Sequence, residues 1–234
     1  MARSLALVTG GTGAVGSAVL RALAARGIPS VFGYHSSTDK AEALSRELGA
    51  RALRCDLRDR AAIRASLGGL ERAPDVFIHC AAVSRNASLA ELTDADWDDS
   101  LEINGRAAFT IGQLLAPSMA QAGGGDIVLV GALDRAQSLP LPVHFAASQG
   151  LLSTLAMSLA KAVGPAGTKV NMVALGVLDE GLSRSLPEKS VADYKAMSAL
   201  RRLGTAAEAA RFITWLALEN RYISGKVLAA NGGI

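Results

Sequence analysis

The chain has 234 residues, of which 50% are apolar and 19% are charged, and its formal net charge is +3. This length and composition suit one α/β domain over residues 1–234 with a sizeable core. The Lys and Arg residues are scattered, whereas a nucleic-acid-binding protein needs a basic patch or stripe. No segment approaches the roughly 18 apolar residues that span a membrane. We therefore expect a soluble, cytoplasmic protein that binds neither nucleic acid nor membrane.

Short apolar runs alternate with longer segments of helical period along the chain. The runs expected to form strands are SLALV, SVFGY, ARALRC, DVFIHC, DIVLVG, KVNMVAL and KVLAA. Helix-like segments lie near 15–26, 38–48, 59–70, 96–122, 143–163 and 205–219. This alternation predicts βαβ crossovers, and therefore a mostly parallel sheet covered on both faces. The irregular stretch of about 177–200 carries Gly, Ser, Pro and charges, which is typical of a lid.

A glycine-rich turn, VTGGTGAVGSAVLRAL, follows the first expected strand and opens the first expected helix. Its glycine spacing lets the backbone turn tightly and approach a pyrophosphate, while the helix start offers free N–H groups and a positive dipole end. The residues expected to contact a dinucleotide here are Gly10, Thr12, Gly13, Val15 and Gly16. The alternative is a tight strand-to-helix turn that holds no ligand.

The residues after the second expected strand indicate which dinucleotide the turn would bind. An acidic residue there would hydrogen-bond a ribose hydroxyl and favour NAD. This chain instead has Tyr34, His35, Ser36 and Ser37, followed by Lys40. Hydroxyl, imidazole and ammonium groups suit a 2′-phosphate, so we expect NADP(H); the alternative is a polar loop without selectivity. At the end of the third expected strand, the pair Asp56 and Leu57 is expected beside the adenine.

Taken together, these features resemble the short-chain dehydrogenase/reductase family, and most of all its bacterial 3-oxoacyl-[acyl-carrier-protein] reductase branch. The likeness includes the glycine turn, the Asp56-Leu57 pair, DADWDDSLEINGRAAF, VNMVALG, RRLGTAAEAARFITWLA and ISGKVLAANGG. It implies a single Rossmann-like doubly wound α/β domain with a seven-stranded parallel sheet. It also implies that Asn104 stands at the position of the family's catalytic asparagine.

Two departures from the family lie on the cofactor side. The branch commonly has a glycine where this chain has Ala14, so the Ala14 methyl group is expected to crowd the phosphates. The family usually shows Asn-Asn-Ala-Gly where this chain has His79, Cys80, Ala81 and Ala82. Ala81 and Ala82 are still expected to line the cofactor. The two cysteines of the chain, Cys55 and Cys80, are expected to be free, buried thiols.

A third departure concerns the catalytic residues. Family members carry a Ser after the fifth strand, then a Tyr and a Lys, where this chain has Ala132, Phe145 and Gln149. Hydride addition to a ketone develops an alkoxide, which needs a hydrogen bond and then a proton. Phe145 has no proton to give, and Gln149 has no charge to tune one, although its amide suits a hydrogen bond to a ribose hydroxyl. The ordinary ketoreductase mechanism is therefore not expected.

Other residues near the expected cleft are candidates for the missing proton donor. His144 has a suitable pKa, but it is one helix position from Phe145 and its alternative is a helix-end or interface histidine. Asp134 would border the substrate, or would be a solvated loop acid. Tyr194, on the lid, would close over the nicotinamide, or would pack in an amphipathic helix. Ser138 lacks an identifiable base, and the widely separated histidines and cysteines show no metal-ligand spacing.

Two functions of different classes follow from this sequence. The first is an atypical enzyme that binds NADP(H) and acts on a polyketide-like small molecule or an acyl-carrier-bound substrate. The second is a catalytically silent subunit that pairs with an active homologous reductase. The resemblance implies a homo-oligomer, a dimer or tetramer, whose dimer interface is formed by the helices near 96–122 and 143–163. A cofactor-occupied sensor is a third interpretation, for which no feature specifically argues.

Overall fold

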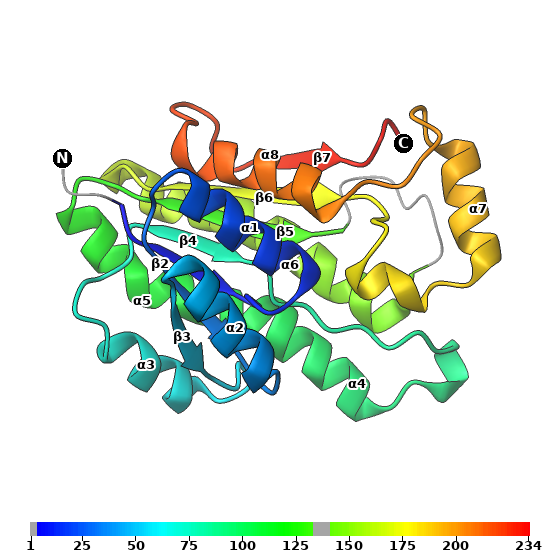
Figure 1. Cartoon of the computed structure of the whole chain (residues 1–234), viewed down its shortest axis with the longest axis horizontal. Helices are drawn as coiled ribbons and strands as arrows, with labels where there is room; N and C mark the ends of the chain where they lie inside the picture. Colours follow the sequence, from blue (N-terminus) through cyan, green and yellow to red (C-terminus); the bar gives the residue numbers. More distant parts are fainter. Residues whose placement is uncertain (1–3, 133–140) are drawn as a thin grey trace.

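One parallel sheet forms the centre of the computed structural model, which describes residues 4–132 and 141–234. Its strand order is β3-β2-β1-β4-β5-β6-β7 (Figure 1). The strands are β1 (Ala6–Thr9), β2 (Ser30–Tyr34), β3 (Arg51–Arg54), β4 (Val76–His79), β5 (Asp126–Gly131), β6 (Lys169–Leu175) and β7 (Val227–Ala230). Every neighbouring pair is parallel. The predicted Rossmann-like fold with a seven-stranded parallel sheet is therefore confirmed.

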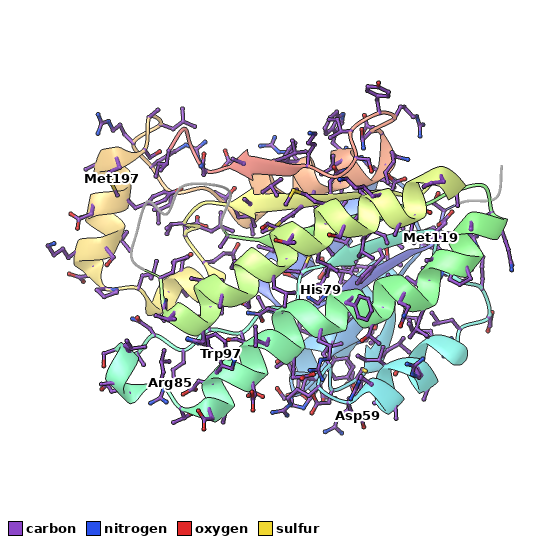
Figure 2. The ribbon with its side chains drawn as sticks, turned by 180° about the vertical axis from the view of Figure 1, so that it is seen from behind. Asp59, His79, Arg85, Trp97, Met119 and Met197 are labelled. Carbon is purple, nitrogen blue, oxygen red and sulfur yellow. The ribbon has the colours of Figure 1, made fainter. Side chains whose placement is uncertain are left out.

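Helices cover both faces of this sheet (Figures 1 and 2). On one face lie α1 (Ala14–Ala25), α2 (Thr38–Leu48) and α8 (Ala206–Leu218). On the other lie α3 (Arg60–Gly68), α5 (Ala107–Gln121) and α6 (Val143–Val163). Each face has its own apolar core, and all four residues of both β1 and β4 are buried. A strand covered on both faces needs apolar side chains at successive positions, which explains the continuous apolar runs in the sequence.

The reversal of chain order between β1 and β4 positions the candidate site. In an open parallel sheet, the connections from two such strands leave in opposite directions, and a crevice opens outside their carboxyl ends. The glycine turn, residues 10–13, follows β1 directly and leads into α1. Residues 80–84 leave the end of β4 beside it. The sheet therefore brings the two predicted cofactor segments to one edge.

The expected single helix over 96–122 is instead three consecutive segments. These are α4 (Asp94–Asp99), a π-helical segment η2 (Ser100–Arg106) and α5. A π turn widens the helix by one residue, and such turns often occur at functional sites. Here it holds Asn104 and Gly105, both buried, against α6. A Cβ atom at Gly105 would come within 2.4 Å of Leu151 on α6, so a glycine allows this close approach.

The stretch 177–200 is more regular than its sequence indicated. It contains a short 3-10 helix η4 (Gly181–Ser185) and the helix α7 (Glu188–Met197). Two more 3-10 turns, η1 (Leu89–Glu91) and η3 (Gly164–Ala166), complete the elements of the described residues. Cys55 is buried and Cys80 is partly buried, and both are free thiols. Within residues 4–132 and 141–234, no helix is long and apolar enough to cross a membrane.

Candidate cofactor and substrate site

The glycine turn has the geometry of a cradle for a diphosphate. Gly10 has φ +65°, a conformation that side chains disfavour, and its carbonyl accepts a hydrogen bond of 2.9 Å from Gly13 N–H. A Cβ atom at Gly16 would lie 2.2 Å from the Gly10 carbonyl oxygen, so this position must be glycine. Gly13 caps α1 without a side chain, and the first N–H groups of a helix have no partner within it. These residues fit the pyrophosphate of a dinucleotide.

The loop after β2 is open and polar, as an adenosine-phosphate site requires. Tyr34 is partly buried at the strand end, whereas His35, Ser36 and Ser37 are exposed. Arg54, at the end of β3, donates a hydrogen bond of 3.3 Å from Nε to the His35 carbonyl. Its guanidinium therefore lies beside this loop and adds a cation to the groups expected there from the sequence. Sequence alone missed it because Arg54 becomes a neighbour only through the pairing of β2 with β3.

Asp56, predicted to face the adenine, is held by a neighbouring guanidinium. Its carboxylate accepts hydrogen bonds of 2.9 to 3.3 Å from the Arg58 side chain and lies 3.7 Å from His35. These contacts, those of Arg58 first, lower the pKa of Asp56 to about 2, so the carboxylate is ionised at neutral pH. Arg58 also reaches Asp99 on α4 at 3.2 Å. Leu57 is partly buried beside this cluster.

A buried imidazole links the two central strands to the π segment. His79 lies at the end of β4, and burial lowers its pKa to about 4, so it is neutral at physiological pH (Figure 2). Its Nε2 lies 3.2 Å from the Asn104 carbonyl, which can only accept, so Nε2 carries the proton. Its Nδ1 then accepts from the Thr9 hydroxyl at 2.8 Å. The Thr9 hydroxyl in turn lies 3.4 Å from the N–H of Ala81.

The Asn104 side chain is fully engaged by protein groups. Its Oδ1 accepts from Val83 N–H at 2.8 Å, and its Nδ2 donates to the Val83 carbonyl at 3.0 Å. The second Nδ2 hydrogen bond, of 2.9 Å, goes to Ser148 Oγ, which donates to the Phe145 carbonyl at 2.7 Å. Asn104 is completely buried. In this arrangement Asn104 fixes the loop after β4 to α6, and it does not line the cavity described below.

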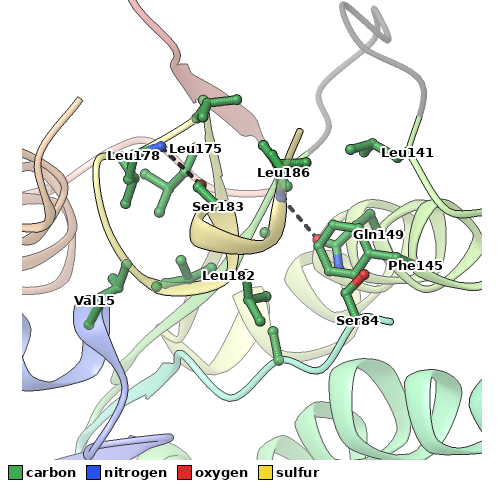
Figure 3. A pocket seen from close by; sticks show the side chains of 18 of the residues that line it. Val15, Ser84, Leu141, Phe145, Gln149, Leu175, Leu178, Leu182, Ser183 and Leu186 are labelled. Carbon is green, nitrogen blue, oxygen red and sulfur yellow. Dashed lines mark hydrogen bonds between the residues drawn. The ribbon is translucent and has the colours of Figure 1, made fainter. Parts of the chain in front are cut away.

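Gln149 closes the end of β5. Its Oε1 accepts a hydrogen bond of 3.0 Å from the Ala132 N–H, which Figure 3 shows beside the Phe145 ring. A Cβ atom at Gly131 would lie 2.5 Å from the same oxygen, so the strand end and the amide are packed tightly. Among the described residues, the one contact of the Nε2 group is a long one of 3.4 Å to Ser148 Oγ. The side-chain oxygen of Gln149 is thus engaged by the end of β5, while its amide nitrogen is the group suited to bind a ligand.

A cavity of about 370 Å³ joins the glycine turn to the residues at these strand ends. Gly13, Ala14, Val15 and Gly16 line one end, and Ala82, Ala132, Phe145 and Gln149 line the other. Leu175, Leu178, Leu182 and Leu186 cover it and give it a mostly apolar wall (Figure 3). Ser84, not identified from sequence, places a hydroxyl near Phe145. Glu180 is the one charged side chain among the described residues of the lining.

The candidate proton donors are placed differently by the structure. His144 is buried outside the cavity lining, and its Nε2 accepts from the Arg85 N–H at 3.2 Å. Tyr194 does line the cavity, but its hydroxyl donates to the Asn231 carbonyl at 2.7 Å and burial raises its pKa. Asp134 and Ser138 lie outside the described residues. Across the described part of the chain, no cluster of His, Cys, Asp and Glu could hold a metal ion.

This combination defines the class of protein. A parallel seven-stranded sheet whose glycine turn faces a crevice at the β1/β4 reversal is a dinucleotide-binding α/β architecture. Residues 11–234 match the family described as Enoyl-(Acyl carrier protein) reductase. The chain therefore belongs to the short-chain dehydrogenase/reductase family, as its sequence motifs predicted.

Individual relatives cover nearly the whole chain. The 3-oxoacyl-[acyl-carrier-protein] reductase of Escherichia coli (strain K12) is 31% identical over 236 residues, which cover 98% of this chain and 96% of the relative. A blue fluorescent protein from a metagenomic library, solved in complex with NADPH, is 31% identical with a TM-score of 0.90, over 98% and 97% of the two chains. BdcA, also solved with NADPH, is 27% identical with a TM-score of 0.88, over 98% and 93%.

Proposed function

We propose that this protein binds NADP(H) and acts, as a single cytoplasmic domain of residues 1–234, on a polyketide-like or acyl-carrier-bound substrate without the family's tyrosine. The observation that carries this proposal is the continuity of the cavity. Its lining includes the start of α1, where a pyrophosphate fits, and Gln149 and Phe145, where a nicotinamide and a substrate would meet. The relatives solved with NADPH support the choice of cofactor.

The wall of the cavity favours an apolar substrate. Leucines, valines, alanines and glycines make up most of it, and no Lys or Arg is among the described residues that line it. A free carboxylate or phosphate on the reacting part of the substrate would find no cation there, and burying an unpaired charge is costly. A neutral acyl or polyketide-like chain fits this wall, with any charged carrier outside the cavity.

A second function, a catalytically silent subunit beside an active homologous reductase, is favoured by two acid groups of the cavity, Cys80 and Tyr194, which line it together with the carboxylate of Glu180. Burial raises the pKa of Cys80 to about 12 and also raises that of Tyr194, whose proton is already donated to Asn231. Phe145, Gln149 and Ala132 supply no titratable group. These residues form a pocket better equipped to bind than to transfer protons. In this function the protein would pair with an active subunit and retain the cofactor.

The test is a titration of the purified protein with NADPH and NADH, followed by the fluorescence of the cofactor. Binding of NADPH about tenfold tighter than NADH supports the proposal, because the cations beside residues 34–37 would pair with the 2′-phosphate. Ser36→Asp adds a carboxylate to that exposed loop. It should weaken the binding of NADPH, while the affinity for NADH should stay unchanged or increase. Absence of binding at millimolar concentrations of either cofactor would overturn the proposal.

Turnover separates the two functions. A ketone or acyl-carrier-linked screen that consumes NADPH with the protein alone supports the enzyme. NADPH binding without turnover, together with capture of a homologous reductase that carries the Ser, Tyr and Lys, supports the silent subunit. If the protein is a symmetric homo-oligomer that binds NADPH and does not associate with the homologous reductase, this result argues against the silent subunit.

A further inference from the structure

The segment after β6 returns over the start of α1. Gly181 has φ +75°, and a Cβ atom built on it would lie 3.2 Å from the Ala14 methyl group. Ala14 is the first residue of α1, next to the glycine turn. The 3-10 helix η4 thus packs against the end of the helix at which the pyrophosphate would bind. In Figure 3 this segment passes between Val15 of α1 and the side chains of α6.

Hydrogen bonds hold the segment in this place. Leu178 N–H donates to Ser183 Oγ at 3.2 Å, which closes the turn that contains Glu180 (Figure 3). Asp179 N–H donates to the Gly204 carbonyl at 3.0 Å. Asn86, from the loop after β4, donates to the Ser185 carbonyl at 2.9 Å. Glu180 is therefore positioned by contacts on both sides of it in the chain.

Glu180 lines the cavity together with the first residues of α1, a helix start that carries no acidic residue of its own. The first turn of α1 has no Asp or Glu, and its cap, Gly13, has no side chain. Arg21, two turns along α1 from Ala14, has its pKa raised mainly by a hydrogen bond to Glu47, and the charge of Glu180 adds to this increase. Glu180 thus lies within electrostatic reach of α1, and it lines the cavity together with Gly13 and Ala14.

We propose that Glu180 lowers the affinity of the site for the pyrophosphate of a dinucleotide, and so sets how tightly the cofactor is held. The proposal rests on the dinucleotide binding proposed above. The positive end of α1 attracts any anion, so a carboxylate and a diphosphate compete for it and repel each other at short range. Arg21 on α1 lies within electrostatic reach of Glu180, but its guanidinium is held by Glu47, and the described lining of the cavity has no Lys or Arg to offset this repulsion.

The test compares NADPH dissociation constants of the wild-type protein, Glu180→Gln and Glu180→Ser. Removal of the charge should lower the NADPH dissociation constant about tenfold at low salt. This difference should shrink at high salt because mobile ions screen the repulsion. Asp179→Asn is the matched control, since Asp179 is the adjacent carboxylate but is exposed and does not line the cavity. The NADPH dissociation constant of Asp179→Asn should stay within about twofold of the wild-type value. The ligand 2′-AMP, which lacks the pyrophosphate, should bind all variants equally.

The outcomes distinguish this proposal from the one on which it rests. If wild-type protein and both Glu180 variants bind NADPH with equal affinity, Glu180 does not limit binding, although dinucleotide binding stands. If the Glu180 variants bind more weakly, the carboxylate assists the ligand and the proposal is wrong. If no protein binds NADPH while the variants keep the wild-type melting temperature, both proposals fail.

Discussion

His79 shows how one buried side chain couples the candidate site to stability. Its ring joins Thr9 on β1 to the Asn104 carbonyl in the π segment, and it is neutral because burial lowers its pKa from 6.5 to about 4. Between these two pH values, the unfolded chain binds a proton that the folded protein does not. The contribution of His79 to stability is thus present above pH 6.5 and is lost as the pH falls toward 4.

The expected size of this loss is about 3 kcal/mol in the free energy of unfolding between pH 6.5 and 4. His79→Asn should remove it, so urea unfolding of the variant should be flatter with pH than that of the wild-type protein. Asp126 acts in the opposite sense, because burial raises its pKa to about 6 and the folded protein then binds the extra proton. Asp126→Asn should therefore make the free energy of unfolding fall more steeply as the pH is lowered. Parallel pH curves for wild-type protein and His79→Asn would contradict this account.

The imidazole of His144 illustrates what a sequence can and cannot say about a site residue. Its neighbour Phe145 lines the cavity, and successive helix positions differ in direction by about 100°. This rotation predicts that His144 points away from the side that Phe145 faces, and the His144 ring lies outside the cavity lining. Its partner, the Arg85 N–H, was not predictable, because it comes from a loop 59 residues earlier in the chain.

At the scale of elements, a hydrogen bond attaches α7 to the residues that follow β7. Tyr194 is buried on α7, and its hydroxyl donates to the Asn231 carbonyl beyond β7. Tyr194→Phe removes this hydrogen bond, which is worth about 1 kcal/mol. We expect amide exchange in Glu188–Met197 to become about fivefold faster, with little change in the central strands. Hydrogen-exchange mass spectrometry measures both regions in one experiment.

A matched control for this prediction is Tyr222→Phe. The Tyr222 side chain is 97% exposed, so its hydroxyl is solvated and its loss should leave exchange unchanged throughout the chain. Equal protection of α7 in wild-type protein and Tyr194→Phe would show that apolar packing, rather than the hydroxyl, anchors the helix.

The elements differ in how far their sequences determine them. Most of the strands were predictable because each is a short apolar run between polar or glycine-containing turns. Burial on both faces requires that pattern in β1 and β4, whereas no residue of the edge strands β3 and β7 is fully buried. The break of the 96–122 helix at η2 was not, because it depends on Gly105 meeting Leu151 and on the Asn104 carbonyl meeting His79. These partners are distant in sequence. The glycine turn was predictable for the opposite reason, since the hydrogen bond that closes it, from Gly13 N–H to the Gly10 carbonyl, and the close approach of Gly16 to Gly10 are local.

At the scale of the whole molecule, one exposed apolar surface remains to be explained. It lies on α4 and α5, which follow one another with η2 between them, and on α6, which runs beside them on one face of the sheet (Figure 2). Trp97, Phe109, Val143, Leu151 and Met157 are each 39 to 48% exposed there. Soluble monomers rarely leave a large contiguous apolar patch in water. Because these are the helices through which the family resemblance implies a dimer, we expect this surface to be covered by a second subunit.

Light scattering coupled to size-exclusion chromatography tests this expectation and also separates the two proposed functions. If the second subunit is another copy of this chain, the wild-type protein should elute as a dimer or tetramer. Leu151→Glu should then shift it to smaller species, because the interface would bury an unpaired charge at a cost of several kcal/mol. Leu89→Glu, which places the same charge on the 3-10 turn η1 at a side chain already 72% exposed, should leave the assembly unchanged.

A different outcome would identify the silent subunit. In that case the wild-type protein is a monomer that assembles only with an active homologous reductase, and the Leu151→Glu substitution weakens this assembly. A wild-type monomer that stays alone in both experiments would contradict the expected interface.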